Sequence, residues 1–150
     1  MTRRFKRPAY LYPTNAVFRT LSRMGVRLGA INILTVVGRT TGQPRSTPVS
    51  PVRVEGRRFL LAPMPQAGWV HNARATGHGQ LTDGTTVEHV VLHEVDDGQL
   101  LRRIMAAFPA QVPHGVRLFK AVGLVKSKDP KEFTAAADLV VAFEVLPAPT

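Results

Sequence analysis

The side chains best suited to chemistry lie in one short polar stretch, Gly38–Arg45. Its two glycines permit a tight bend in which several backbone N–H groups point the same way and form a site for an anion. Arg39 and Arg45 add forked donors that match phosphate or carboxylate groups. Further hydroxyl donors are Thr40, Thr41, Ser46 and Thr47. The Gly-Lys-Ser/Thr ending of a P-loop is missing, so the stretch predicts another kind of anion site, or else a plain hairpin turn with solvated arginines.

A second group of interest consists of Trp69 and Asn72, which follow a short loop. Trp69 is the one tryptophan of the chain. A lone aromatic residue of this kind can fasten a short helix to a core, and an asparagine can serve as a cap or a turn residue. Both roles are compatible with a cofactor bound nearby, so the residues alone leave the structural and the functional interpretation open.

The string Leu34–Val49 resembles the signature of the deazaflavin (coenzyme F-420)-dependent nitroreductase and oxidoreductase family. In that family a strand ends in Gly-Arg-(Lys/Thr)-(Ser/Thr)-Gly, then Arg, then Thr-Pro, and a Trp, two residues and Asn follow some thirty residues later. Trp69–Asn72 and the final Leu146-Pro147 agree with this layout, so the resemblance covers most of the chain. It implies a flavin-reductase-like split β-barrel that transfers a hydride from reduced F-420 to a small organic acceptor, namely a quinone, an enone or a nitro compound.

The resemblance also implies which residues bind the cofactor, an 8-hydroxy-5-deazaflavin with a phosphate and an anionic oligoglutamate tail. The phosphate and the first glutamates would be held by Gly38, Arg39, Thr40, Thr41, Gly42 and Arg45. The lactyl and ribityl part would run along Thr47, Pro48 and Val49. The ring system would lie on Leu61, Ala62, Pro63 and Met64, with backbone N–H groups bonded to its carbonyls. The residues that would close the pocket near the tail are Trp69 and Asn72.

The chain departs from the family in the residues that would meet the acceptor. Late tyrosines are absent, since the two tyrosines are Tyr10 and Tyr12, and the approach to the tryptophan is shortened to Met64–Gly68. Nitroimidazole activation is therefore not carried over to this chain. The catalytic residue stays unknown: the candidates for the proton donor are His71, Tyr12 and solvent.

The charge is strongly positive and unevenly distributed. The net charge is +10, and the first 58 residues hold twelve Lys or Arg against one acid, Glu55. Such a field attracts nucleic acid, an acidic membrane surface or a polyanionic small molecule. Aromatic residues that could stack on bases are scarce among the basic strands, so we expect no specific nucleic acid, although a non-catalytic basic nucleic-acid-binding barrel is an alternative. A split barrel that binds FMN, haem or biliverdin is another.

Composition and spacing bear on metals, location and assembly. The chain has no cysteine, His71 and His78 lack acidic neighbours at ligand spacing, and His89 and His93 lie too far apart along a strand to bind one ion, so no metal site is expected. No apolar run reaches the roughly 18 residues of a membrane-spanning helix. We therefore expect a soluble, cytoplasmic protein, with contact to an acidic membrane surface left open. The resemblance also allows a homodimer, because the cofactor site of relatives can lie near a partner chain.

The elements that must position these residues follow from hydrophobic periodicity and turn signals. Residues 1–12 form a basic arm, and 13–150 form a single cofactor-binding domain. A helix from Thr14 or Asn15 to Gly29 carries an apolar stripe and, on another face, arginines that are either solvated or turned toward acidic lipid. The expected strands are 31–37, 48–54, 58–62, 80–82, 86–95 and 139–146, and the later helices are 69–75, one from Asp96 or Asp97 through Phe108, and 113–122.

A polar turn at 38–45, a loop at 64–68 and a charged loop at 126–132 connect these elements. Short strands with turn signals and few helices predict a mainly β (α+β) fold, a small antiparallel barrel with an N-terminal amphipathic helix and peripheral helices. Alternation of parallel strands with helices is absent, as is a Gly-x-Gly-x-x-Gly dinucleotide fingerprint.

Overall fold

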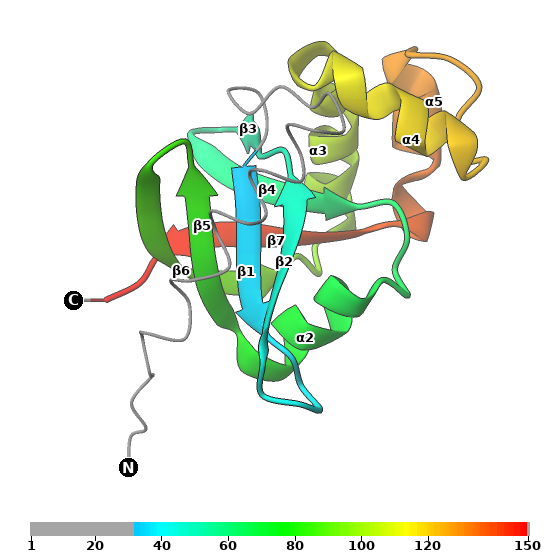
Figure 1. The fold of residues 1–150 in the computed structure, drawn as a ribbon. Helices are drawn as coiled ribbons and strands as arrows, with labels where there is room; N and C mark the ends of the chain where they lie inside the picture. The colour runs from blue at the N-terminus through cyan, green and yellow to red at the C-terminus, as the bar shows by residue number, and fades with distance from the viewer. Residues whose placement is uncertain (1–31, 150) are drawn as a thin grey trace.

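One antiparallel sheet dominates the computed structural model, which describes residues 32–149 (Figure 1). The predicted arm, 1–12, and the predicted helix up to Gly29 lie outside the described residues. The strands of the sheet are β1 (Asn32–Val37), β2 (Pro44–Val49), β3 (Val52–Val54), β4 (Arg57–Ala62), β5 (His78–Asp83), β6 (Thr86–Glu94) and β7 (Val141–Pro147).

The order of the strands explains why the sheet curls into a barrel with a split. They lie side by side as β2-β1-β5-β6-β7-β4-β3, so β2 and β3 form the two edges. These edges are nevertheless joined by only two residues, Ser50 and Pro51. A link this short requires that the edges approach each other, and the sheet therefore closes almost completely. The predicted antiparallel split barrel is confirmed.

The split widens along β4 because β3 is short. The pairing of β3 with β4 ends at Val52 and Phe59, whereas β4 continues through Leu60–Ala62 beside β7. Within the described residues, this last part of β4 therefore has a neighbouring strand on one side only. Its other side faces the gap toward β2, which leaves backbone donors and acceptors there for a ligand.

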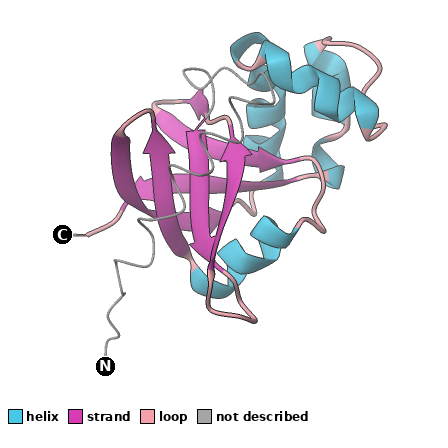
Figure 2. Cartoon of the chain, viewed as in Figure 1, coloured by secondary structure: helices cyan, strands magenta, loops and turns pink. Residues whose placement is uncertain are grey.

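Four α-helices complete the described part of the chain. They are α2 (Gly68–Thr76), α3 (Gly98–Gln111), α4 (Val116–Ala121) and α5 (Pro130–Ala135), with 3-10 turns at Pro113–Gly115 (η3) and Ala137–Leu139 (η4). Figure 2 shows α3, α4 and α5 gathered on one side of the sheet, whereas α2 lies apart from them. The side chain of Asp97 caps α3 by accepting from Gln99 N and Leu100 N, as the sequence predicted.

Two hydrophobic cores support these elements. The barrel core includes Leu34, Val36, Leu60, Val70 and Phe143. The helical core lies between α3, α4, α5 and the strands β3 and β4, and it contains a trio of aromatic rings. Ring centroids in this trio are 4.7 Å (Phe108 to Phe119), 5.1 Å (Phe119 to Phe133) and 5.8 Å (Phe108 to Phe133) apart.

Two predictions about elements were wrong. The expected strand 48–54 is two strands on opposite edges of the sheet, because Pro51 cannot donate a ladder hydrogen bond and the chain changes edge there. The polar turn is correspondingly shorter, and β2 already begins at Pro44. The expected loop 126–132 holds the start of α5, because the side chain of Asp129 accepts from Lys131 N at 2.9 Å and Pro130 occupies the first helical turn.

Candidate functional site

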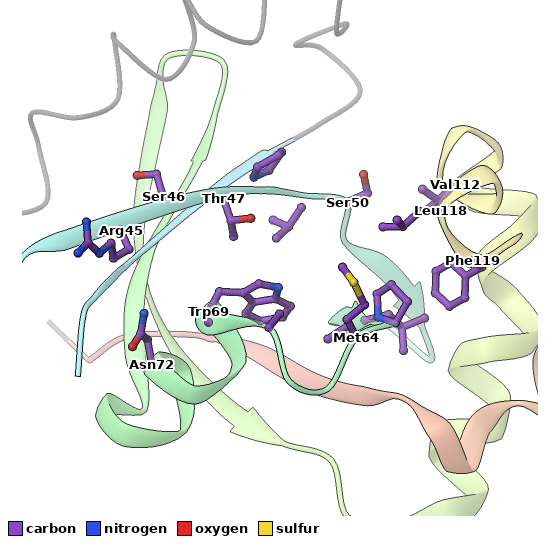
Figure 3. A pocket seen from close by; sticks show the side chains of 18 of the residues that line it. Arg45, Ser46, Thr47, Ser50, Met64, Trp69, Asn72, Val112, Leu118 and Phe119 are labelled. Atoms are coloured by element: carbon purple, nitrogen blue, oxygen red, sulfur yellow. The ribbon is translucent and has the colours of Figure 1, made fainter. Parts of the chain in front are cut away.

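A cavity of about 810 Å³ opens at the split of the barrel, between β2 on one side and the end of β4 with its following loop on the other. Every residue predicted to hold the cofactor lines it except Gly42. Figure 3 shows how it extends from Arg45 and Asn72, past Trp69, to Met64, Leu118 and Phe119. The structure thus brings the two sequence motifs to one cavity and adds a third wall.

The turn between β1 and β2 forms the first end of this cavity. Gly38 N donates to Gln43 O at 2.8 Å, and Gly42 N donates to Gly38 O at 2.9 Å. Gly42 has φ +74°, a conformation that favours glycine. Gly42 therefore shapes the turn from outside the cavity lining, while Thr41 before it and Arg45 after it line the cavity.

Asn72 holds the arginine of this turn in place. Its Oδ1 accepts from the backbone N of Arg39 at 3.0 Å and from the Arg39 Nη1 at 2.9 Å. Asn72 is buried on α2, whereas Arg39 is exposed. One side-chain oxygen therefore fixes both the backbone and the guanidinium of Arg39, so that the charge stays at the cavity. Asn72 therefore positions Arg39, in addition to its predicted contact with a cofactor.

The arginines of the cavity differ from four arginines elsewhere in the described part of the chain. Four other arginines each pair with a glutamate: Arg57 with Glu144, Arg58 with Glu88, Arg74 with Glu94, and Arg103 with Glu55. Hydrogen bonds from the paired arginines hold the pKa of Glu88, Glu94 and Glu144 below its ordinary value. Among residues 32–149, no carboxylate lies within ion-pair distance of Arg39 or Arg45. These two guanidinium groups are therefore open to an anionic ligand.

The middle of the cavity combines strand backbone with one large aromatic ring. Leu61 and Ala62 of β4 and the following Pro63 line it where, among the described residues, β4 pairs with β7 alone. The first residues of α2 line it as well, and helix N-termini carry partial positive charge. Trp69 is half-buried and packs against Phe143 with a centroid distance of 5.7 Å. It therefore belongs to the barrel core and to the cavity wall at once.

The far end of the cavity is apolar, and sequence reasoning missed it. This wall is formed by Phe108 of α3, by Val112 directly after α3, and by Leu118 and Phe119 of α4; Figure 3 shows the last three. Met64 and Leu118 are each 45% exposed, so they lie where the cavity opens to solvent. No motif identifies these residues, because only the packing of the helical core against β4 brings them to the cavity.

One hydrogen-bonded pair, also missed, lies at this apolar end. Ser50 Oγ and His114 Nε2 are 3.1 Å apart, and both residues line the cavity. Of the proton donors expected from the sequence, His71 does not line the cavity, and Tyr12 lies outside the described residues. Within residues 32–149, no group of three or more His, Cys, Asp or Glu side chains could hold a metal ion.

Comparisons with known proteins place these observations in context. The sequence profile of the F420H(2)-dependent quinone reductase family matches residues 12–117. A search of the curated proteins found no match to the chain. No helix of the described residues has the length and the apolar character needed to cross a membrane.

Several solved structures share the fold at low sequence identity. A structure described as an F420-H2 dependent reductase is 19% identical, with a TM-score of 0.54, 77% of this chain covered and 93% of that one. A domain-swapped dimer is 18% identical, with a TM-score of 0.54 and coverage of 89% and 99%. The haem storage protein HutZ from Vibrio cholerae is 15% identical, with a TM-score of 0.51 and coverage of 94% and 92%. At these identities the likeness concerns the fold alone.

Proposed function

Because the chain belongs to the F420H(2)-dependent quinone reductase family, and is therefore an oxidoreductase that uses F-420, we propose that it reduces a quinone at the cavity in the split of the barrel. The observation that carries this proposal is the polarity of the cavity. Two guanidinium groups lie at one end, without carboxylate partners among residues 32–149, and an apolar wall lies at the other. A long cofactor with an anionic tail and a flat ring system has the same polarity.

The residues present fit the successive parts of the cofactor in their order along the cavity as well as in charge. Arg45 and Ser50 are five residues apart along β2 and its exit, which corresponds to roughly 16 Å of extended chain. Tail phosphate and glutamates would meet Arg39 and Arg45, the ribityl part would follow Thr47–Val49, and the ring would lie against Leu61–Met64. The cavity volume of about 810 Å³ lies within the range typical of cofactor sites.

The cofactor supplies a hydride for the acceptor, and the chain supplies position and a dry surface. The turn between β1 and β2 anchors the anionic tail, which fixes how far the ring reaches along the cavity. The unpaired side of Leu60–Ala62 offers backbone N–H groups to the carbonyls of the ring. Trp69 and Met64 exclude water from its surface.

The direct test is a titration of the purified protein with oxidised F-420, followed by fluorescence. We expect saturable binding that weakens as salt rises, because part of the affinity comes from the arginines. An absence of saturable binding at low salt would contradict the proposal. FMN and haem, titrated in parallel, test the alternative split-barrel functions. FMN has one phosphate and no glutamate tail, so it offers fewer anionic groups to Arg39 and Arg45, and we expect weaker binding.

A second expected result concerns Asn72. Replacing Asn72 by alanine removes the acceptor that holds the Arg39 backbone and guanidinium, so the charge is no longer fixed at the cavity. We expect about a 10-fold loss of F-420 affinity, the equivalent of one net hydrogen bond to a charged group. Isothermal titration calorimetry measures it. Arg74→Ala, on the same helix but paired with Glu94, is the matched control and should bind as the wild type does.

A homodimer is a further expectation for the assembly. One solved structure that shares the fold is a domain-swapped dimer, which supports the proposal only as far as the fold is shared. Sedimentation equilibrium of the full chain measures the oligomeric state. A single species at the monomer mass of 16.4 kDa across a wide concentration range would contradict it.

A further inference from the structure

The pair formed by Ser50 and His114 has no role in holding the cofactor, yet it lies at the end of the cavity where the ring would meet its acceptor. Ser50 directly follows β2, and His114 belongs to the turn η3 between α3 and α4. Their Oγ and Nε2 atoms are 3.1 Å apart. The pair connects two elements separated by 64 positions in the sequence and fixes the orientation of the imidazole.

The backbone that carries His114 is itself held firmly. Gly115 N donates to Val112 O at 2.9 Å, and Val112 N donates to Phe108 O at 2.8 Å. A Cβ atom added to Gly115 would lie 2.7 Å from Phe108 Cζ and 3.0 Å from Val112 Cγ1. The turn η3 therefore lies directly on the end of α3, and its glycine permits this close approach.

His114 is also the one imidazole among the described residues that line the cavity. The other ionisable lining residues are Arg39 and Arg45, and a guanidinium does not release its proton in proteins. Histidine exchanges protons readily in this range. His114 is exposed as well, so solvent can reload it after each turnover.

We propose that His114, oriented by Ser50, binds the carbonyl oxygen of the electron acceptor and donates the proton that completes its reduction. This inference rests on the proposed function. It requires an acceptor with a flat apolar ring and a carbonyl group, because Val112 and Leu118 lie beside Ser50 at this end of the cavity (Figure 3). A quinone or an enone meets that description.

The step balances in atoms and electrons. Reduction of a quinone to a quinol consumes one hydride and one proton. The hydride and its electron pair come from the reduced cofactor, whose oxidation also releases one proton to the solvent. The proton for the quinone oxygen comes from Nδ1–H of the imidazolium of His114, because its Nε2 is hydrogen-bonded to Ser50 Oγ; the Nδ1–H bond breaks and an O–H bond forms. Neutral His114 then takes up a proton from the solvent, so no further reactant is needed.

The experiment compares His114→Gln and Ser50→Ala with wild-type protein loaded with F-420 and a water-soluble naphthoquinone. We expect kcat of His114→Gln to fall about 100-fold, the usual contribution of a general acid, while its affinity for oxidised F-420 is unchanged. Ser50→Ala should lose less, because the imidazole remains. His71→Gln removes a histidine outside the cavity lining and should keep wild-type turnover.

A second measurement does not depend on turnover. In 15N-labelled protein the imidazole signal of His114, identified by its loss in His114→Gln, should shift when the naphthoquinone is added to protein loaded with oxidised cofactor. Full turnover by His114→Gln, or no shift of this signal, would overturn the role of His114. Failure of the wild-type protein to bind F-420 would instead contradict the proposed function on which this role rests.

Discussion

Replacing both Arg39 and Arg45 by alanine lowers the affinity for F-420 with its full tail by about 100- to 20,000-fold, since each charge-assisted interaction contributes about 1.5–3 kcal/mol and about 1.4 kcal/mol is tenfold. The reason is that neither guanidinium has a carboxylate partner among the described residues, so both are open to the tail. Fluorescence titration of the variant with cofactors of graded tail length measures the effect.

Two controls separate this specific loss from a general change in charge. The deazaflavin chromophore without phosphate and glutamates should bind the variant about as well as it binds the wild type. The double variant Arg53→Ala/Arg102→Ala removes the same net charge from residues outside the cavity lining, and it should keep nearly full affinity. Equal weakening for tailed and tail-less compounds would show that the turn does not hold the tail.

Replacing Phe119 by alanine lowers the free energy of unfolding by about 3–5 kcal/mol, the range observed for buried phenylalanines. Phe119 is 2% exposed and packs against the rings of Phe108 and Phe133. Its loss leaves a void that joins the cavity, because Phe119 also lines the cavity wall. Urea unfolding followed by circular dichroism measures the change in midpoint.

The neighbouring residue provides the matched control. Leu118 lies on the same helix and lines the same cavity, but it is 45% exposed. Leu118→Ala should therefore change the free energy of unfolding by no more than about 0.5–1 kcal/mol. A similar cost for the two substitutions would mean that α4 is not held by the aromatic trio.

Sequence reasoning was most successful where the signal is local. The Gly38–Arg45 turn, the helix that begins near Trp69 and the strands on either side of Asp83-Gly84 all depend on neighbouring residues, and the structure has all three. Turn glycines and capping side chains act within a few positions of themselves. The start of α5 is another local signal, because Asp129-Pro130 is a recognised helix start.

The missed part of the site depends on contacts between distant segments. Ser50 and His114 are 64 positions apart, and they meet only because the helical core sets η3 against the exit of β2. The division of 48–54 into two strands has a similar origin, because the closure of the barrel decides which edge each half joins. A single sequence carries little information about such pairings. Pro51, however, does argue against one continuous strand.

The two hydrophobic cores support different parts of the cavity wall. Val49, Ala67 and Trp69 of the cavity lining pack against the barrel core, whereas Phe108, Val112 and Phe119, at the apolar end, belong to the helical core. We therefore expect substitutions in α3 and α4 to change which acceptor the protein reduces while its affinity for F-420 is retained. Evolution of a new acceptor specificity could then proceed in the second half of the chain without loss of cofactor binding.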